Sequence, residues 1–90
     1  MPRKAAPYFV YLLRCADGSL YTGITTDVKR RFAEHKAKRG GSYTRSHEVR
    51  QILRTERYPT RAAALKREAE IKRWRREQKL VFISMNRRKK

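Results

Sequence analysis

The apolar positions of this chain follow two different periods, and the shorter period comes first. Residues 8–15, YFVYLLRC, are apolar, aromatic or β-branched on both alternating faces, which predicts a strand that is covered on both sides. A second stretch, residues 20–25, predicts another strand, and Ala16-Asp17-Gly18 between them is typical of a hairpin turn. The chain therefore begins its folded part with a β-hairpin.

The length of the hairpin loop decides which faces its tyrosines occupy. A two-residue loop puts Tyr11 and Tyr21 on opposite faces. A three-residue loop, with Gly18 in the left-handed region, pairs Tyr11 with Gly23 and puts both tyrosines on one face. If the two tyrosines act together, the three-residue loop is required.

A helical period follows the hairpin. Thr26 or Asp27 can cap a helix that we expect to continue to about Lys38 and to stop at Gly40-Gly41. Residues 40–47, GGSYTRSH, then form a polar loop that is rich in hydrogen-bond donors.

The phase of this first helix separates two neighbouring arginines. At about 100° per residue, Val28, Phe32 and His35 form one apolar-facing arc, and Arg31 lies at its edge. Arg30 points the other way. We therefore expect Arg31 and His35, but not Arg30, to face the sheet.

The second half of the chain is read as one strand and two helices. Residues 48–57 predict a third, less regular strand, and Pro59-Thr60 starts a helix over roughly residues 61–75. Residues 76–86 contain LVFI, which fits a strand or a buried helix. Of the two we favour a short helix that packs beside Trp74.

One carboxylate falls on the apolar arc of the long helix. Glu68 lies in the middle of that arc and Glu70 on the solvent side, and the arc is spanned by Ala64, Leu65, Ala69 and Ile71. A buried carboxylate must be paired, protonated or metal-bound, because burying it bare costs on the order of several kcal/mol. Lys72 shares the arc and is a candidate partner. We expect Glu68 to be the only carboxylate that faces inward.

Charge narrows the range of partners. The 90 residues include 25 Lys and Arg against 8 Asp and Glu, a net charge of +17, while 39% hydrophobic content supports a folded chain. Nucleic acid is the favoured partner over an anionic membrane surface, since no long amphipathic helix with a Trp/Leu face is evident. We expect one domain over residues 8–86, with basic tails at residues 1–7 and 87–90.

The compartment follows from cysteine usage and the lack of targeting segments. Cys15 is the single cysteine, so an internal disulfide is excluded and a small buried strand residue is its expected role. No secretion signal or membrane-spanning run is evident. We expect a cytoplasmic protein that does not engage a membrane, with a monomer as the default state.

Several kinds of catalytic site are excluded by the residues present. Cys15, His35 and His47 lack zinc-site spacing, and Gly40-Gly41 lacks the Lys-Ser/Thr pair of a phosphate-binding loop. Paired carboxylates of a two-metal nuclease are also missing. Hydrolysis would therefore have to use one carboxylate and one metal ion.

The remaining chemistry-bearing residues occur in a characteristic order. Tyr11 is followed by Tyr21-Thr22-Gly23, then by Arg31-x-x-x-His35, and much later by Glu68. This order resembles the GIY-YIG nuclease superfamily, and more narrowly its small stand-alone members without an appended DNA-binding domain. The resemblance covers about residues 8–83.

The sequence departs from the family pattern at packing positions. The first triplet is Phe9-Val10-Tyr11 rather than Gly-Ile-Tyr, and Thr22 takes the place of Ile in the second. Both tyrosines and Gly23, which has a structural role at the site, are retained. The departures therefore affect packing positions, and the residues expected to carry out the chemistry are kept.

The resemblance implies an α+β domain with a three-stranded antiparallel sheet flanked by helices. It implies one divalent metal ion, Mg²⁺ or Mn²⁺, at Glu68, and charge stabilisation by Arg31. Tyr11 would be the base or the water-orienting group, with Tyr21 and His35 assisting. Since an ordinary tyrosine pKa of about 10 suits a base poorly, we expect Arg31 or the metal to lower the pKa of Tyr11.

These observations together predict a metal-dependent endonuclease that hydrolyses phosphodiester bonds in DNA, in repair, recombination or processing. The cations expected to contact nucleic acid are Lys29, Arg30, Lys36, Arg45 and Lys72. One alternative is a binding module for DNA or RNA that keeps the fold without turnover. Another is a basic, ribosome-associated structural protein.

Overall fold

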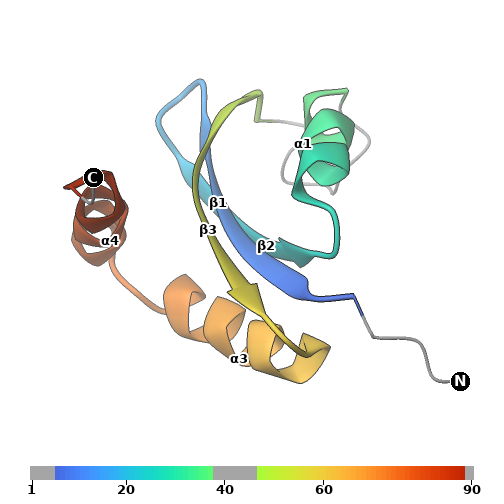
Figure 1. The fold of residues 1–90 in the computed structure, drawn as a ribbon. Coiled ribbons are helices and arrows are strands. Elements are labelled where there is room, and N and C mark those ends of the chain that lie inside the picture. Colours follow the sequence, from blue (N-terminus) through green and yellow to red (C-terminus); the bar gives the residue numbers. More distant parts are fainter. Residues whose placement is uncertain (1–5, 38–46, 89–90) are drawn as a thin grey trace, which may run out of the picture.

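The structure, a computed structural model, describes residues 6–37 and 47–88, with side chains as far as Met85. Its elements in chain order are β1 (Tyr8–Cys15), β2 (Leu20–Thr25), α1 (Val28–Lys36), β3 (Val49–Tyr58), α3 (Arg61–Lys72) and α4 (Arg76–Arg88). The strands form one antiparallel sheet in the order β2-β1-β3 (Figure 1). The expected α+β class, a three-stranded antiparallel sheet flanked by helices, is confirmed.

Each face of the sheet is covered by its own helices. Figure 1 shows α1 on one side of the sheet and α3 and α4 on the other. We call these the α1 face and the α3 face. β1 is the central strand, and this position explains why its sequence is apolar on both alternating sets of positions.

Two hydrophobic clusters result from this arrangement. The cluster on the α3 face comprises buried residues of β1, α3 and α4, which are Val10, Leu12, Ala64, Ile71, Phe82 and Ile83. The cluster on the α1 face comprises Tyr11, Leu13, Cys15 and Val49, with Phe32 and Ile52 packed against it. Cys15 is buried there, as expected.

The β1–β2 hairpin has the three-residue loop. Cys15 N donates to Ser19 O at 2.9 Å, which closes the loop over residues 16–18. Gly18 has φ +87°, a left-handed conformation that side chains rarely adopt. Tyr11 is therefore paired with Gly23 and Leu13 with Tyr21, so both tyrosines project onto the α1 face.

Of the two candidate caps for the first helix, Thr26 and Asp27, the structure uses Asp27. Asp27 is the N-cap, and its Oδ1 accepts a hydrogen bond from Arg30 N at 3.0 Å. α1 ends at Lys36, earlier than the expected Lys38. The predicted glycine stop and most of the polar loop lie in residues 38–46, outside the described residues, as do residues 1–5 of the predicted N-terminal tail.

The later helices differ from expectation mainly in their ends. α3 begins after the N-cap Thr60 as expected, but it ends at Lys72 rather than Arg75. The LVFI segment is helical, and α4 continues to Arg88, beyond the expected end at residue 86. The rings of Trp74 and Phe82 lie 5.3 Å apart, so α4 packs beside Trp74 as predicted.

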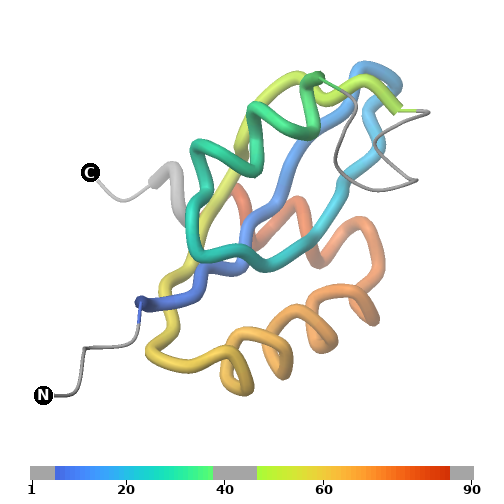
Figure 2. Tube along the Cα trace, turned by 90° about the vertical axis from the view of Figure 1, so that its right-hand side faces the viewer, coloured from blue at the N-terminus to red at the C-terminus, as the bar shows by residue number. Residues whose placement is uncertain are grey.

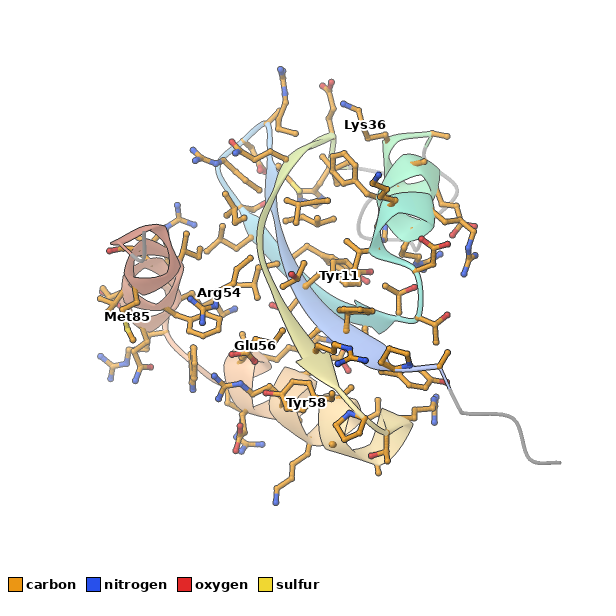
Figure 3. The ribbon with its side chains drawn as sticks, viewed as in Figure 1. Tyr11, Lys36, Arg54, Glu56, Tyr58 and Met85 are labelled. Atoms are coloured by element: carbon orange, nitrogen blue, oxygen red, sulfur yellow. The ribbon has the colours of Figure 1, made fainter. Side chains whose placement is uncertain are left out.

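A charged cluster joins β3 to α3 and α4, and it corrects one expectation. The Glu56 side chain is 19% exposed, and its Oε1 accepts from Arg67 Nε at 2.9 Å and from the Tyr58 hydroxyl at 2.8 Å. The Arg54 guanidinium lies 3.9 Å from the centre of the Phe82 ring and donates to Phe82 O (Figure 3). Glu68 is therefore not the only inward-facing carboxylate, because β3 contributes another that its irregular strand pattern concealed.

Candidate active site

The Tyr11 side chain is central to the α1 face. It is 2% exposed, and its ring lies over Gly23 of the neighbouring strand. A Cβ atom at Gly23 would be 2.6 Å from Tyr11 Oη and 2.8 Å from Cζ, distances that real Cβ atoms do not show. Gly23 is therefore needed so that the Tyr11 ring can reach across to β2, the edge strand of the sheet.

Three rings gather around this position. The Tyr21 ring centre lies 6.2 Å from that of Tyr11 and 5.2 Å from that of His35. Tyr11 Oη is 2.9 Å from His35 Nε2, a buried hydrogen bond between β1 and α1. The predicted co-location of Tyr11, Tyr21 and His35 is present, and the helical phase that placed His35 inward is correct, since His35 is 1% exposed.

The two neighbouring arginines differ in exposure as their phase predicted. The Arg31 side chain is 30% exposed and that of Arg30 is 56% exposed. Both are paired with Glu34, whose Oε1 lies 2.8 Å from Arg31 Nη1 and whose Oε2 lies 3.2 Å from Arg30 Nη1. The hydrogen bond from Arg31 holds the pKa of Glu34 below its ordinary value, and the same hydrogen bond raises the pKa of Arg31.

The electrostatics of Tyr11 oppose one expectation. Burial raises the pKa of Tyr11 well above 10, and the nearby Tyr21 raises it further, whereas Arg31 lowers it only in part. Arg31 by itself therefore does not produce the expected fall of the Tyr11 pKa, because desolvation outweighs this cation. Burial, followed by Arg31, lowers the pKa of His35. Near pH 7 the hydrogen bond thus joins two neutral groups.

Glu68 lies on the other face of the sheet. Its helix α3 packs against β1 and β2 from the α3 face, running from the β3 side toward the β2 side (Figure 2). The Glu68 side chain is 17% exposed, and Oε2 lies 3.1 Å from Lys72 Nζ. The candidate residues therefore form two groups, with β2 as the sheet edge between them.

The centre of the buried arc on α3 is displaced from the one that the sequence predicted. Ala64 and Ile71 are fully buried, but Leu65 is 37% exposed and Ala69 is also exposed. Glu68 is consequently at the margin of the buried face and not in its middle. A carboxylate at a margin can be reached from solvent, which a ligand for an exchangeable ion requires.

The donor set at Glu68 fits only one type of metal site. Among the described residues, no three His, Cys, Asp or Glu side chains are grouped so that they could enclose a metal ion. Mg²⁺ keeps several waters and is commonly held by one or two carboxylates together with substrate phosphate. Glu68 fits that role if Lys72, whose side chain is 54% exposed, moves aside.

The chain matches the GIY-YIG catalytic domain over residues 7–81, which is most of its length. The chain belongs to the GIY-YIG family. This family comprises nuclease-type domains that act on nucleic acid and that are generally dependent on divalent metal ions.

Small single-domain proteins of this family are similar over most of their length. UPF0213 protein Reut_B5558 of Cupriavidus pinatubonensis is 48% identical over 77 residues, 86% of each chain. UPF0213 protein NP_0776A of Natronomonas pharaonis is 52% identical over 68 residues, 76% of this chain and 80% of that one. Among solution NMR structures, EF2693 of E. faecalis is 35% identical with a TM-score of 0.63, covering 96% of this chain and 92% of the other. The UPF0213 protein BH0048 of Bacillus halodurans is 36% identical with a TM-score of 0.54, covering 88% and 84%.

The predicted nucleic-acid contacts of this GIY-YIG domain are spread over both faces. Lys29, Arg30 and Lys36 are exposed on α1, where the Lys36 ammonium lies 5.6 Å from the centre of the Phe32 ring. Lys72 is on α3 beside Glu68. Arg45 lies outside the described residues. These cations surround the sheet and do not form a single patch.

The sequence analysis missed Glu34, the carboxylate that orients Arg31. Its signal was present in the spacing, because Glu34 follows Arg31 by three residues and Arg30 by four. In the described ranges, no helix combines the length and the apolar character that crossing a bilayer requires.

Proposed function

We propose that this protein is a divalent-metal-dependent endonuclease that hydrolyses phosphodiester bonds in DNA. The observation that carries the proposal is the hydrogen bond between Tyr11 Oη and His35 Nε2 beside Arg31. Phosphodiester hydrolysis requires an activated water, a neutralised phosphoryl group and a stabilised leaving oxygen. Residues of the α1 face can supply the first two.

Water activation follows from the neutral Tyr11–His35 pair. Because the pKa of Tyr11 is raised, a free phenolate is not available near pH 7. Tyr11 can instead accept a proton from water while its own proton passes to His35 Nε2. The hydroxide formed attacks phosphorus, the bond to the leaving oxygen breaks, and that oxygen takes a proton from solvent. Tyr21, whose ring packs against His35, positions the imidazole.

Charge stabilisation requires an exchange of partners at Arg31. Glu34 holds the guanidinium at 2.8 Å, and a substrate phosphate would replace that carboxylate. The pair is partly exposed, so the exchange costs little. We assign to Glu34 the role of a positioning residue, which keeps Arg31 oriented until the phosphate arrives.

Glu68 would hold the metal ion, with Lys72 displaced, and the ion would neutralise phosphoryl charge and lower the pKa of bound water. Tyr11 lies over β2 on one face, and α3 packs against β2 on the other. A scissile phosphate at the edge of β2 is therefore the position from which both groups of residues can be approached.

We also retain the cytoplasm as the compartment and the monomer as the working state.

The test is a cleavage assay on branched, single-stranded and duplex DNA with Mg²⁺ or Mn²⁺, against the same mixtures with EDTA. The proposal requires metal-dependent cleavage that Arg31→Ala reduces strongly. Cleavage that persists in EDTA would contradict the metal dependence, and cleavage that Arg31→Ala leaves intact would contradict the role of Arg31.

A second candidate function is a nucleic-acid-binding module without turnover. One observation favours it: Arg31 and Glu68 are each paired within the chain, with Glu34 and Lys72 respectively. The two functions differ in a single-turnover experiment with protein in excess and Mn²⁺ present. Binding without any product supports the module and contradicts the endonuclease.

A further inference from the structure

A pocket lies on the α3 face, away from the Tyr11–His35 pair. It has a volume of about 440 Å³, within the range of small-molecule sites, and it is formed where α4 approaches the β1–β2 hairpin. Its walls are the apolar side chains Leu20, Leu53, Leu80 and Ile83. Leu80 is 44% exposed, a large apolar side chain that the fold leaves accessible.

Two arginines accompany these apolar walls. Arg14 and Arg76 both line the pocket and both are exposed. Arg76 Nη2 lies 4.0 Å from the position that a Cβ of Gly18 would occupy, so its guanidinium reaches the hairpin turn. Within the described residues, neither arginine forms an ion pair with a carboxylate. The pocket therefore suits a ligand with an apolar part and adjacent negative charge.

The pocket and the candidate active site share strand β2. Leu20 faces the pocket and the next residue, Tyr21, packs against His35 on the opposite face. A nucleic-acid strand that passes the edge of β2 at the scissile phosphate would meet the pocket within a few nucleotides.

We propose that this pocket binds one unpaired nucleobase of the substrate, with Arg14 and Arg76 on the flanking phosphates. The proposal rests on the nucleic-acid substrate of the proposed function and adds its form, a duplex that carries a single-stranded arm. An extruded base is commonly held between apolar side chains, and arginine suits the phosphates on either side.

Charge argues for this occupant over two others. Two copies of a chain with net charge +17 would repel each other. The apolar surface that the described residues offer at this pocket is also small. A phospholipid would also offer an anionic group with an apolar part. However, Leu80 lines this pocket whereas Val81 and Met85 line a different one, beside Arg54 and Trp74, so the exposed apolar side chains of α4 are divided between two pockets that each contain arginine.

The experiment measures the affinity of the full chain, in EDTA, for a duplex with a single-stranded arm and for the same duplex with blunt ends. The arm nucleotides are replaced one at a time by an abasic residue. Ser84→Phe fills the pocket from its rim, and Arg14→Gln and Arg76→Gln each remove one phosphate contact. Arg75→Gln is the matched control, because it removes the same charge next to Arg76 without lining the pocket.

One abasic position should weaken binding by the wild-type chain about 5- to 160-fold, the range for one stacked base. In Ser84→Phe that position should cease to matter, and the preference for the arm over blunt ends should disappear. Arg14→Gln and Arg76→Gln should reduce the preference, whereas Arg75→Gln should weaken both substrates equally. A thermal melt verifies that each variant is folded.

Other outcomes overturn the proposal. An abasic scan that is flat in the wild type, or one that is unchanged in a folded Ser84→Phe variant, shows that no base enters the pocket. Binding to phosphatidylglycerol vesicles or to an acidic peptide that Ser84→Phe abolishes, with DNA affinity unchanged, assigns the pocket to that ligand. Because the assay does not require cleavage, an abasic-sensitive position in a chain that never cuts DNA contradicts the proposed function and leaves this inference standing.

Discussion

Tyr11 Oη lies 2.9 Å from His35 Nε2 and joins the central strand of the sheet to a helix that begins 17 residues further along the chain, at Val28. The two groups are buried, and burial moves their pKa values in opposite directions, up for the phenol and down for the imidazole. Both shifts favour the neutral forms. The bond is therefore stable near pH 7 and is weakened by protonation of His35.

This relationship predicts how stability depends on pH. Because the folded pKa of His35 is lower than the ordinary 6.5, the unfolded chain takes up the proton first as pH falls. The contribution of neutral His35 is complete above about pH 6.5 and is lost as pH drops through that value toward the folded pKa. The slope should not exceed about 1.4 kcal/mol per pH unit.

Urea unfolding at pH 7.5, 6.5 and 5.5 measures this slope. His35→Gln should flatten it, because the titrating group is gone. His47→Gln is the control for removing a histidine and should leave the contribution of His35 in place, since His47 is outside the Tyr11 cluster. An equal slope in the His35→Gln variant would show that another group is responsible.

Gly23→Ala should disrupt the site through the Tyr11 ring. The added Cβ would be 2.6 Å from Oη and 2.8 Å from Cζ of a ring that is buried and cannot move freely. We expect a loss of about 1–3 kcal/mol in unfolding free energy, the usual cost of overpacking, together with a loss of cleavage. Both can be measured by denaturant unfolding and by the cleavage assay.

Gly18→Ala is the matched control for this change. It strains a positive-φ turn, but its Cβ meets only the distant Arg76 guanidinium at 4.0 Å. It should destabilise the chain without changing turnover under conditions where the variant is folded. If both variants lose turnover equally, instability alone accounts for the effect of Gly23→Ala.

Arg31 and Arg30 should differ although they are neighbours and share Glu34. Arg31→Ala should lower turnover by roughly 10²-fold or more, the scale of losing one preorganised charge stabiliser. Arg30→Ala should mainly weaken binding and should recover at lower salt, because its side chain is 56% exposed. Single-turnover rates at saturating protein separate the two effects. Equal losses in this rate would mean that the exposure difference has no catalytic meaning.

DNA binding should depend steeply on salt and little on base sequence. The net charge of +17 exceeds what solubility requires, and the sequence contains no evident groove-reading motif. With six or more phosphate contacts, affinity should fall on the order of 10³-fold between 50 and 200 mM salt. A titration with random-sequence duplexes measures this, and a flat response or a strong preference for one duplex sequence would contradict it.

Local patterns predicted the α1 face well. A three-residue loop closed by Gly18 fixes the pairing of Tyr11 with Gly23, and helical phase separates Arg31 from Arg30. These features depend on residues close together in the sequence. The side-chain period of a strand and of a helix is then sufficient to assign faces.

Relationships between distant elements were not predictable in the same way. Helical phase shows that Glu68 is turned toward the sheet, but not that α3 covers the face opposite Tyr11. The ion pair of Glu56 with Arg67 needs β3 and α3 to be side by side. The direction of the Tyr11 pKa shift without a metal ion was misjudged, because Arg31, which lowers this pKa, can be identified in the sequence. The burial that raises it cannot.

The assignment of Glu68 can be tested by three measurements on one Glu68→Gln preparation: a thermal melt, a DNA-binding isotherm and a cleavage assay. The substitution keeps the shape and removes the charge. Since Lys72 is 54% exposed, the Glu68–Lys72 pair is worth about 0–1 kcal/mol, and the fold should remain intact. Cleavage should be lost, while binding should be retained or become tighter, because a negative charge near the phosphate is removed.

Lys72→Gln distinguishes a metal ligand from a structural ion pair. If Lys72 and a metal ion compete for the Glu68 carboxylate, removing the ammonium at 3.1 Å should lower the Mg²⁺ or Mn²⁺ concentration that gives half-maximal cleavage. A structural pair predicts instead that both variants melt at similarly reduced temperatures and that the metal requirement is unchanged. Normal cleavage by Glu68→Gln would remove its metal role altogether.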